Sequence, residues 1–146
     1  MGTATTWADG QLLLIFQNTN FGGLGDATGL RGSTTVGSIY LSLHSADPGA
    51  GGNQSTNEIS YTGYARLAVA RTNVQWSESS GVVTNLLELD FGLCTVGSAN
   101  VTHVGIGTDP SGSGKLMFSG AVSTPRSISA GVEPRFSASA LTVTIT

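Results

Sequence analysis

Apolar and polar residues alternate with a period of two over most of the chain. The alternation recurs at residues 38–44, 66–70, 87–91, 104–106, 116–118 and 141–146. This period predicts strands that bury one face and leave small polar side chains on the other. Clusters of turn-forming residues separate these segments, at residues 47–53, 79–81, 109–114 and 131–134. The pattern therefore predicts a mainly β fold, an antiparallel β-sandwich or a jelly-roll-like barrel.

The same alternation identifies the side chains expected in the core. In a strand, a shift of one residue turns every apolar side chain to the opposite face, so the pattern specifies which face is buried. We expect twelve side chains to form one contiguous buried cluster, namely Ile39, Leu41, Leu43, Leu67, Val69, Leu89, Phe91, Val104, Ile106, Phe118, Val143 and Ile145.

The N-terminal segment departs from this pattern. Residues 8–18 gather their apolar side chains on one helical face, which predicts one short helix that ends near Asn18. Residues 19–35 are rich in glycine and predict a long loop or an extended arm. We therefore expect an N-terminal helix and Gly-rich arm over residues 1–35, and a β-sandwich domain over residues 36–146.

Charged side chains are scarce in this chain. They make up 10% of the 146 residues, the net charge is −3, and about a quarter of the residues are Ser or Thr. A chain with a single lysine lacks the clustered positive charge that neutralises phosphates, so we expect no nucleic-acid partner. The apolar run at residues 12–16 is too short to span a membrane, and we expect no membrane partner.

The cysteine content restricts the chemistry further. Cys94 is the single cysteine, which excludes an internal disulfide framework and a cysteine-clustered zinc site. We expect Cys94 to be a small buried apolar residue. The acidic residues are scattered, without the spacing of a glycosidase pair or of a calcium loop.

The glycine-rich segment 109–115 has an incomplete phosphate-loop pattern. That motif needs Gly and Ser or Thr where this sequence has Asp109 and Leu116. A strand, rather than a helix that could hold an anion, is expected to follow. The segment therefore predicts a hairpin turn, and we expect no cofactor.

The two histidines, His44 and His103, could meet across neighbouring strands, and Asp47 could approach His44. A Ser/His/Asp arrangement stays open at this point because a triad is defined in space. In so hydroxyl-rich a chain, however, a serine near a histidine is expected by chance. We favour structural roles, with His44 bonded to the backbone of the turn at residues 47–49 and His103 on a sheet face or a subunit contact. We predict no catalytic and no metal-binding residue.

Aromatic residues indicate where the chain meets partners. The cluster of Tyr61, Tyr64 and Arg66 fits a sugar-stacking platform, the edge of the core, or an oligomer contact. Residues 1–35 carry more apolar surface than one helix could hide against a small sandwich, so we expect that surface to cover a partner. The alternative is that the helix closes one end of its own sandwich. The candidate assembly surface is Trp7, Leu12, Phe16, Phe21, Tyr61, Tyr64 and Arg66.

Several segments resemble a known family. They are SIYLSLHSADPG at residues 38–49, residues 58–69, VTHVGIG at residues 101–107, GKLMFSG at residues 114–120, residues 128–131, and residues 141–144. Together they cover about residues 36–146. These segments resemble small structural proteins of tailed-bacteriophage virions, variously labelled tail fibre, minor virion or decoration proteins. The resemblance implies no catalytic residues.

This resemblance implies a non-enzymatic virion protein that is made in the host cytoplasm. Within the particle we favour a capsid decoration (cement) protein on the exterior of the shell, because the chain has no fibrous repeat and buried area across capsid junctions would stabilise the shell. Its expected partners are copies of itself, most simply as a trimer, and the major capsid protein or other virion proteins. The alternative is a tail or head fibre component or adaptor, including one that binds glycans for host attachment.

Overall fold

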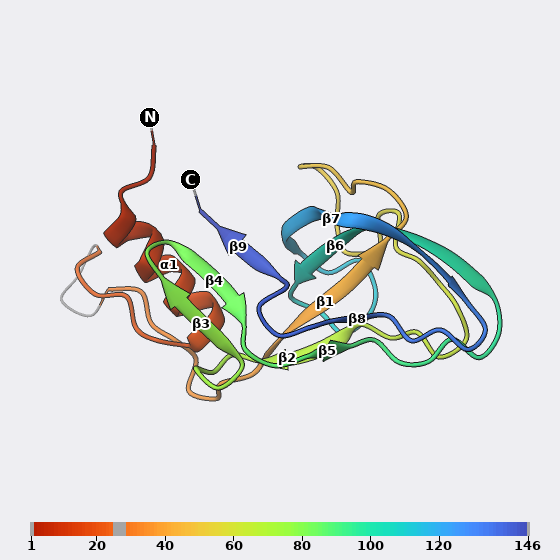
Figure 1. The fold of residues 1–146 in the computed structure, drawn as a ribbon. Helices are drawn as coiled ribbons and strands as arrows, with labels where there is room; N and C mark the ends of the chain where they lie inside the picture. The colour runs from red at the N-terminus through yellow and green to blue at the C-terminus, as the bar shows by residue number, and fades with distance from the viewer. Residues whose placement is uncertain (1, 25–28, 146) are drawn as a thin grey trace. The chain divides into compact units, whose positions relative to one another are not determined.

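The computed structural model describes residues 2–24 and 29–145, whose helix and antiparallel strands are drawn in Figure 1. Strands take up 39% of the chain and helix 9%. The predicted class, mainly β with one helix near the N-terminus and consistent with a β-sandwich, is confirmed. The elements are α1 (Thr5–Gln17), β1 (Ser38–His44), β2 (Leu67–Ala70), β3 (Trp76–Ser79), β4 (Val82–Asn85), β5 (Leu89–Asp90), β6 (Ser98–Gly107), β7 (Leu116–Ser129), β8 (Arg135–Phe136) and β9 (Thr142–Thr144).

The chain divides into two compact units, each built from segments that are distant in sequence. The helix unit comprises Met1–Ser38, Ala70–Leu89 and Phe136–Thr146, and the sheet unit comprises Ile39–Val69 and Asp90–Arg135. This grouping is based on contacts in space, and it differs from the division at residue 35 that we expected from the sequence. The division at residue 35 stays a prediction.

Helix α1 begins three residues before the predicted start at residue 8. Its first turn is closed by backbone bonds to the Ala4 carbonyl, and the N-cap residue Ala4 makes no side-chain capping bond, so the sequence carries no start signal. The helix ends as expected at Asn18, which adopts a left-handed φ of 54°. The Asn18 amide then binds the Ser33 backbone at 2.8 Å through both its nitrogen and its oxygen, which ties the later part of the Gly-rich loop to the helix end.

The helix packs on a hairpin that the alternation did not reveal. Strands β3 and β4 pair in register around Ser80 and Gly81, whose φ angles of 54° and 78° suit a two-residue turn. The predicted turn at residues 79–81 is therefore confirmed, but apolar and polar residues do not alternate in its two flanking strands, where Val82 and Val83 are consecutive. Strand β9 completes the sheet, in the order β3-β4-β9, and α1 lies against β3 and β4 (Figure 1).

The sheet unit is built on strands in the order β2-β1-β6-β7. Strands β1 and β6 pair antiparallel, with His44 opposite His103. The 14-residue β7 forms one edge, and every residue from Ser119 to Ser127 is exposed except the half-buried Val122. The β6–β7 register shifts between the paired positions Ala121 and Arg126.

Nine of the twelve predicted core side chains are buried. The other three, Leu67, Phe118 and Ile145, are half-buried. Leu67 and Phe118 lie on the edge strands β2 and β7, and alternation along a strand carries no information about its place in the sheet. Leu89, Val143 and Ile145 belong to the helix unit and the rest to the sheet unit, so the expected side chains are distributed over both units.

Candidate functional site

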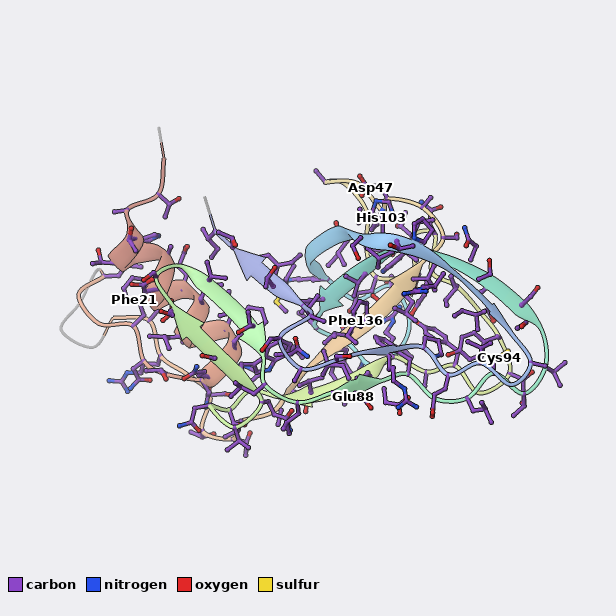
Figure 2. All side chains as sticks on the ribbon, in the orientation of Figure 1. Phe21, Asp47, Glu88, Cys94, His103 and Phe136 are labelled. Atoms are coloured by element: carbon purple, nitrogen blue, oxygen red, sulfur yellow. The ribbon has the colours of Figure 1, made fainter. Side chains whose placement is uncertain are left out.

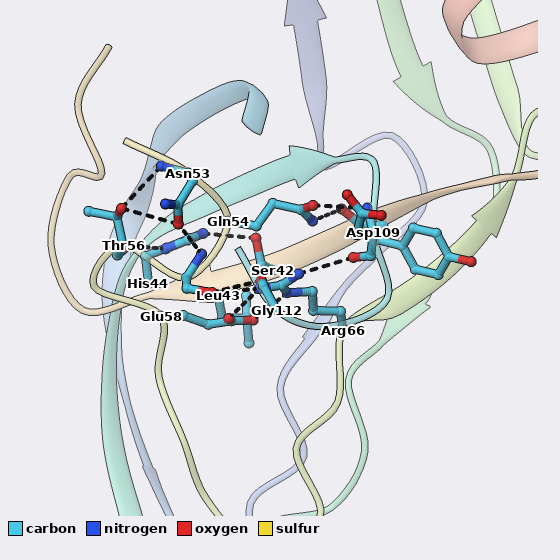
Figure 3. A network of polar contacts seen from close by, with 12 residues as sticks. Ser42, Leu43, His44, Asn53, Gln54, Thr56, Glu58, Arg66, Asp109 and Gly112 are labelled. Carbon is cyan, nitrogen blue, oxygen red and sulfur yellow. Dashed lines mark hydrogen bonds and ion pairs between the residues drawn. The ribbon is translucent and has the colours of Figure 1, made fainter. Parts of the chain in front are cut away.

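A set of polar contacts, part of it buried, lies in the sheet unit, where two loops meet the end of β1 (Figure 3). One loop runs from residue 45 to residue 66, and the other, residues 108–115, joins β6 to β7. We call this set the loop network. Its members are Ser42, His44, Gln54, Thr56, Glu58, Arg66, Asp109 and Gly112.

Arg66 connects the two loops. Its Nε and Nη2 donate to the two carboxylate oxygens of Glu58, at 2.8 and 2.7 Å, and its side chain is only 3% exposed. The other guanidinium donors reach the carbonyls of Asp109 at 3.1 Å and Gly112 at 2.6 Å. The hydrogen bond to Glu58 raises the pKa of the Arg66 guanidinium above its usual value. A planar, bidentate cation of this kind holds both loops in one geometry.

Gln54 fills the space between the same loops. It is fully buried, and its Oε1 accepts the Asp109 backbone N–H at 2.9 Å. Its own backbone N–H donates to Ser113 at 3.1 Å. A Cβ at Gly107 or at Gly114 would lie 2.1 Å from the Gln54 side chain. Both positions are therefore restricted to glycine by close approach.

Ser42 and His44 form a hydroxyl–imidazole pair. Ser42 Oγ lies 2.8 Å from His44 Nε2, and His44 Nδ1 lies 2.8 Å from the Thr56 carbonyl oxygen. Because a carbonyl only accepts, Nδ1 carries the proton and Nε2 accepts from the Ser42 hydroxyl. Burial lowers the pKa of His44 below its usual value, which favours this neutral form.

The pair has the connectivity of an activated serine but no access for a substrate. Both residues have 0% exposure. A Cβ added at Gly105 would lie 2.6 Å from His44 Nε2 and 2.8 Å from Ser42 Oγ, so β6 covers the pair directly. Nucleophilic catalysis needs the hydroxyl within reach of the reacting carbon. The arrangement therefore serves packing and loop position.

One prediction about His44 is wrong, because His44 binds the Thr56 carbonyl rather than the backbone of the turn at residues 47–49. The Asp47 carboxylate accepts the Gly49 N–H at 2.9 Å and closes its own turn. The expected proximity of His44 and His103 across strands is confirmed, and His103 lies half-buried on the sheet with its Nδ1 2.9 Å from Thr102 Oγ1.

The aromatic cluster at residues 61–66 is used inside the unit. Tyr61 is buried, its ring centroid lies 5.4 Å from that of Tyr64, and its hydroxyl donates to the Gly92 carbonyl at 3.0 Å. The Tyr64 hydroxyl accepts the Leu43 N–H and donates to Glu58. Burial raises the pKa of both hydroxyls. Among the three readings of this cluster, these contacts favour the core.

The remaining candidate assembly residues lie in the helix unit. Leu12 and Phe16 have 0% exposure, and Phe16 packs edge-on against Trp76 of β3, with ring centroids 4.9 Å apart. Trp7 is 37% exposed and packs against the half-buried Phe21, with ring centroids 4.7 Å apart. Figure 2 labels Phe21 beside α1. The assembly surface stays a prediction. Of its residues in the helix unit, Trp7 and Phe21 are the ones accessible to solvent.

Other chemistry suggested by the sequence has simple structural outcomes. Residues 108–115 form the predicted hairpin turn, closed by a bond from the Thr108 N–H to the Lys115 carbonyl, and strand β7 follows. Cys94 is a free, buried thiol, as predicted. Over residues 2–24 and 29–145, no three His, Cys, Asp or Glu side chains are grouped to hold a metal ion. No helix in that part of the chain combines the length and the apolar character needed to cross a membrane.

The sequence analysis missed most of the loop network. Gln54, Thr56 and Glu58 lie in a loop without periodicity, so nothing in their spacing marks them as buried. One signal was available, because Gly105 and Gly107 interrupt an apolar strand. Glycine within a strand often marks a place where another group approaches the backbone closely, and here that group is His44 or Gln54.

Comparison with known proteins identifies the family. A family model described as podophage GP4 fiber I protein gp80 matches residues 27–144, which include the whole loop network. Helix α1 precedes the matched segment. A comparison with curated proteins gives no match. The match confirms the resemblance to small tailed-phage virion proteins of the fibre type. This chain belongs to the family of podophage GP4 fiber I protein gp80.

Proposed function

We propose that this protein is a non-enzymatic structural component of a podophage fibre. The observation that carries the proposal is the match of residues 27–144 to a fibre protein family. The match covers strands from both units together with both loops of the loop network. A role in the fibre agrees with the alternative considered from the sequence rather than with capsid decoration.

The geometry of the loop network supports a mechanical role. The buried charge of Arg66 is paired with Glu58, and Arg66 also donates to the carbonyls of Asp109 and Gly112 in the second loop. A buried polar network whose members are paired makes a loop pair rigid, whereas an unpaired member would be costly. Ser42, the serine nearest to an imidazole, is covered. These features suit a block that keeps its shape in an assembly.

In this proposal the chain works in the virion as a homotrimer, and Trp7 and Phe21 contribute to the contact between copies. The low density of charge reduces repulsion between copies. Trp7, Leu24 and Leu30 are each between 37% and 39% exposed in the helix unit, and apolar surface of this kind is favourable to cover. Sedimentation of the purified chain should give a trimer. Trp7→Ser should weaken it, whereas Val74→Ser, at a 65% exposed position, should not.

Capsid decoration is the second candidate, favoured by the absence of a fibrous repeat in the sequence. Immunogold labelling of intact particles, with the amount of this protein measured relative to the major capsid protein, separates the two roles. We expect gold on the fibres, and we expect the copy number of this protein to be a small fraction of that of the capsid protein. Gold over the whole shell, with an amount in fixed proportion to the capsid protein, would support decoration and overturn the fibre role.

A further inference from the structure

Two carboxyl groups meet where α1 packs on the β3–β4 hairpin. Glu78 of β3 accepts the Gly81 N–H at 3.1 Å, and the negative charge of Asp9 in α1 acts on the Glu78 carboxyl group. A Cβ at Gly81 would lie 3.5 Å from Ala8 Cβ and 3.9 Å from Asp9 Oδ1, which places the Asp9 carboxyl directly over the turn of the hairpin. We call Asp9 and Glu78 the carboxyl pair.

The carboxyl pair is incompletely compensated. Asp9 Oδ1 is buried and has no hydrogen-bond partner. Two carboxyl groups can hydrogen-bond to each other only when one of them holds a proton, because ionised carboxylates are acceptors only. With both ionised, the negative charge of Asp9 disfavours the charge of Glu78 across the contact between helix and hairpin.

Among the residues that the structure describes, no positively charged group acts on Glu78. Among the described residues, the influences on Glu78 are burial, the Gly81 N–H, and the hydrogen bond and negative charge of Asp9. The guanidinium of Arg71 lies at the other end of the helix, where it donates to the carbonyls of Leu14 at 2.5 Å and Ile15 at 2.6 Å. Strand β4 carries no ionisable side chain.

We propose that the carboxyl pair makes the docking of α1 on its hairpin dependent on pH, with the helix held more tightly when the pair carries a proton. Burial raises the pKa of Glu78 above its ordinary value of 4.5. For an acid whose pKa is raised on folding, the stabilisation is full below the ordinary value and is lost as the pH rises through the folded value. Loss of docking would uncover Leu12 and Phe16, two of the candidate assembly residues.

The two tryptophans, Trp7 and Trp76, make this proposal measurable. Trp76 is fully buried against Phe16 of the helix, so in a Trp7→Phe background its emission reports docking. Between about pH 4 and pH 8, we expect this emission to shift to longer wavelength as the pH rises. Hydrogen exchange of the α1 amides in the unchanged chain, corrected for the intrinsic pH dependence of exchange, should accelerate over the same range.

The decisive variant is Asp9→Asn, which removes one charge and keeps a hydrogen-bonding group. It should reduce the pH-dependent shift and raise the melting temperature of the helix unit at neutral pH by several degrees. The matched control is Asp47→Asn, which removes an exposed carboxylate in the sheet unit and should leave the shift unchanged. A pH profile that is the same in the unchanged chain and in Asp9→Asn, or a lower melting temperature in Asp9→Asn, would overturn the proposal.

Discussion

The helix unit and the sheet unit keep their shapes by different means. In the helix unit, an apolar stripe of Ala8, Leu12 and Phe16 packs on a hairpin around the buried Trp76, and its acidic contact is left uncompensated. In the sheet unit, buried charge is paired and its loops are joined by Arg66. Apolar packing tolerates small shifts, whereas hydrogen bonds demand fixed geometry. Loop placement in the sheet unit therefore depends on a buried charge that is paired.

The largest effect should come from Trp76→Ala in the helix unit. Trp76 is fully buried, and truncating a buried tryptophan typically costs about 3–5 kcal/mol. Urea denaturation followed by the emission of Trp7, which remains in this variant, would measure the loss. Trp7→Phe, at a 37% exposed position, is the control and should change stability far less. A loss below about 1 kcal/mol in Trp76→Ala would mean that packing around this side chain does not hold the unit.

A smaller effect should follow from adding one methyl group to the sheet unit. In Gly105→Ala the new Cβ would lie 2.6 Å from His44 Nε2 and 2.8 Å from Ser42 Oγ, and such overpacking costs about 1–3 kcal/mol. Gly120→Ala on β7 is the matched variant, because its Cβ would meet nothing within 4 Å. Its stability should stay within about 0.5 kcal/mol of the unchanged chain.

All three tyrosines, Tyr40, Tyr61 and Tyr64, lie in the sheet unit. Tyrosine absorbance during denaturation would therefore measure the stability of the sheet unit in the two glycine variants. Equal stabilities of the two glycine variants would show that β6 does not pack tightly against Ser42 and His44 at Gly105. The same readout applies to the smallest effect, which concerns acid.

The two units should respond to acid with opposite signs. Burial lowers the pKa of His44. Just below about pH 6.5, His44 is therefore protonated in the unfolded chain but still neutral in the folded sheet unit. The free energy of unfolding of the sheet unit should therefore fall as the pH drops through 6.5, the ordinary pKa of histidine. In the helix unit the pKa of Glu78 is raised, so the free energy of unfolding should rise as the pH drops. His44→Gln should reduce the acid loss seen by tyrosine absorbance. An unchanged slope in that variant would contradict this assignment.

Prediction from sequence succeeded where burial follows the local pattern and failed where it depends on distant contacts. Alternation located β1, because Ile39, Leu41 and Leu43 all face the interior. It missed β3 and β4, which are short and which depend on α1 to cover them. The predicted partner of His44 was a nearby turn, but the actual acceptor, Thr56, is placed by the loop network. Buried polar contacts between loops leave no periodic trace, so Gln54 and Glu58 could only be found in three dimensions.

The edge strand β7 has a consequence for copies held close together. An exposed edge offers unpaired backbone groups to any neighbouring strand, and indiscriminate sheet extension leads to aggregation. Strand β7 interrupts such pairing midway, because Pro125 has no N–H, Arg126 adds a charge, and the register shifts between Ala121 and Arg126. Uncontrolled β-sheet pairing between copies along this edge is thereby discouraged.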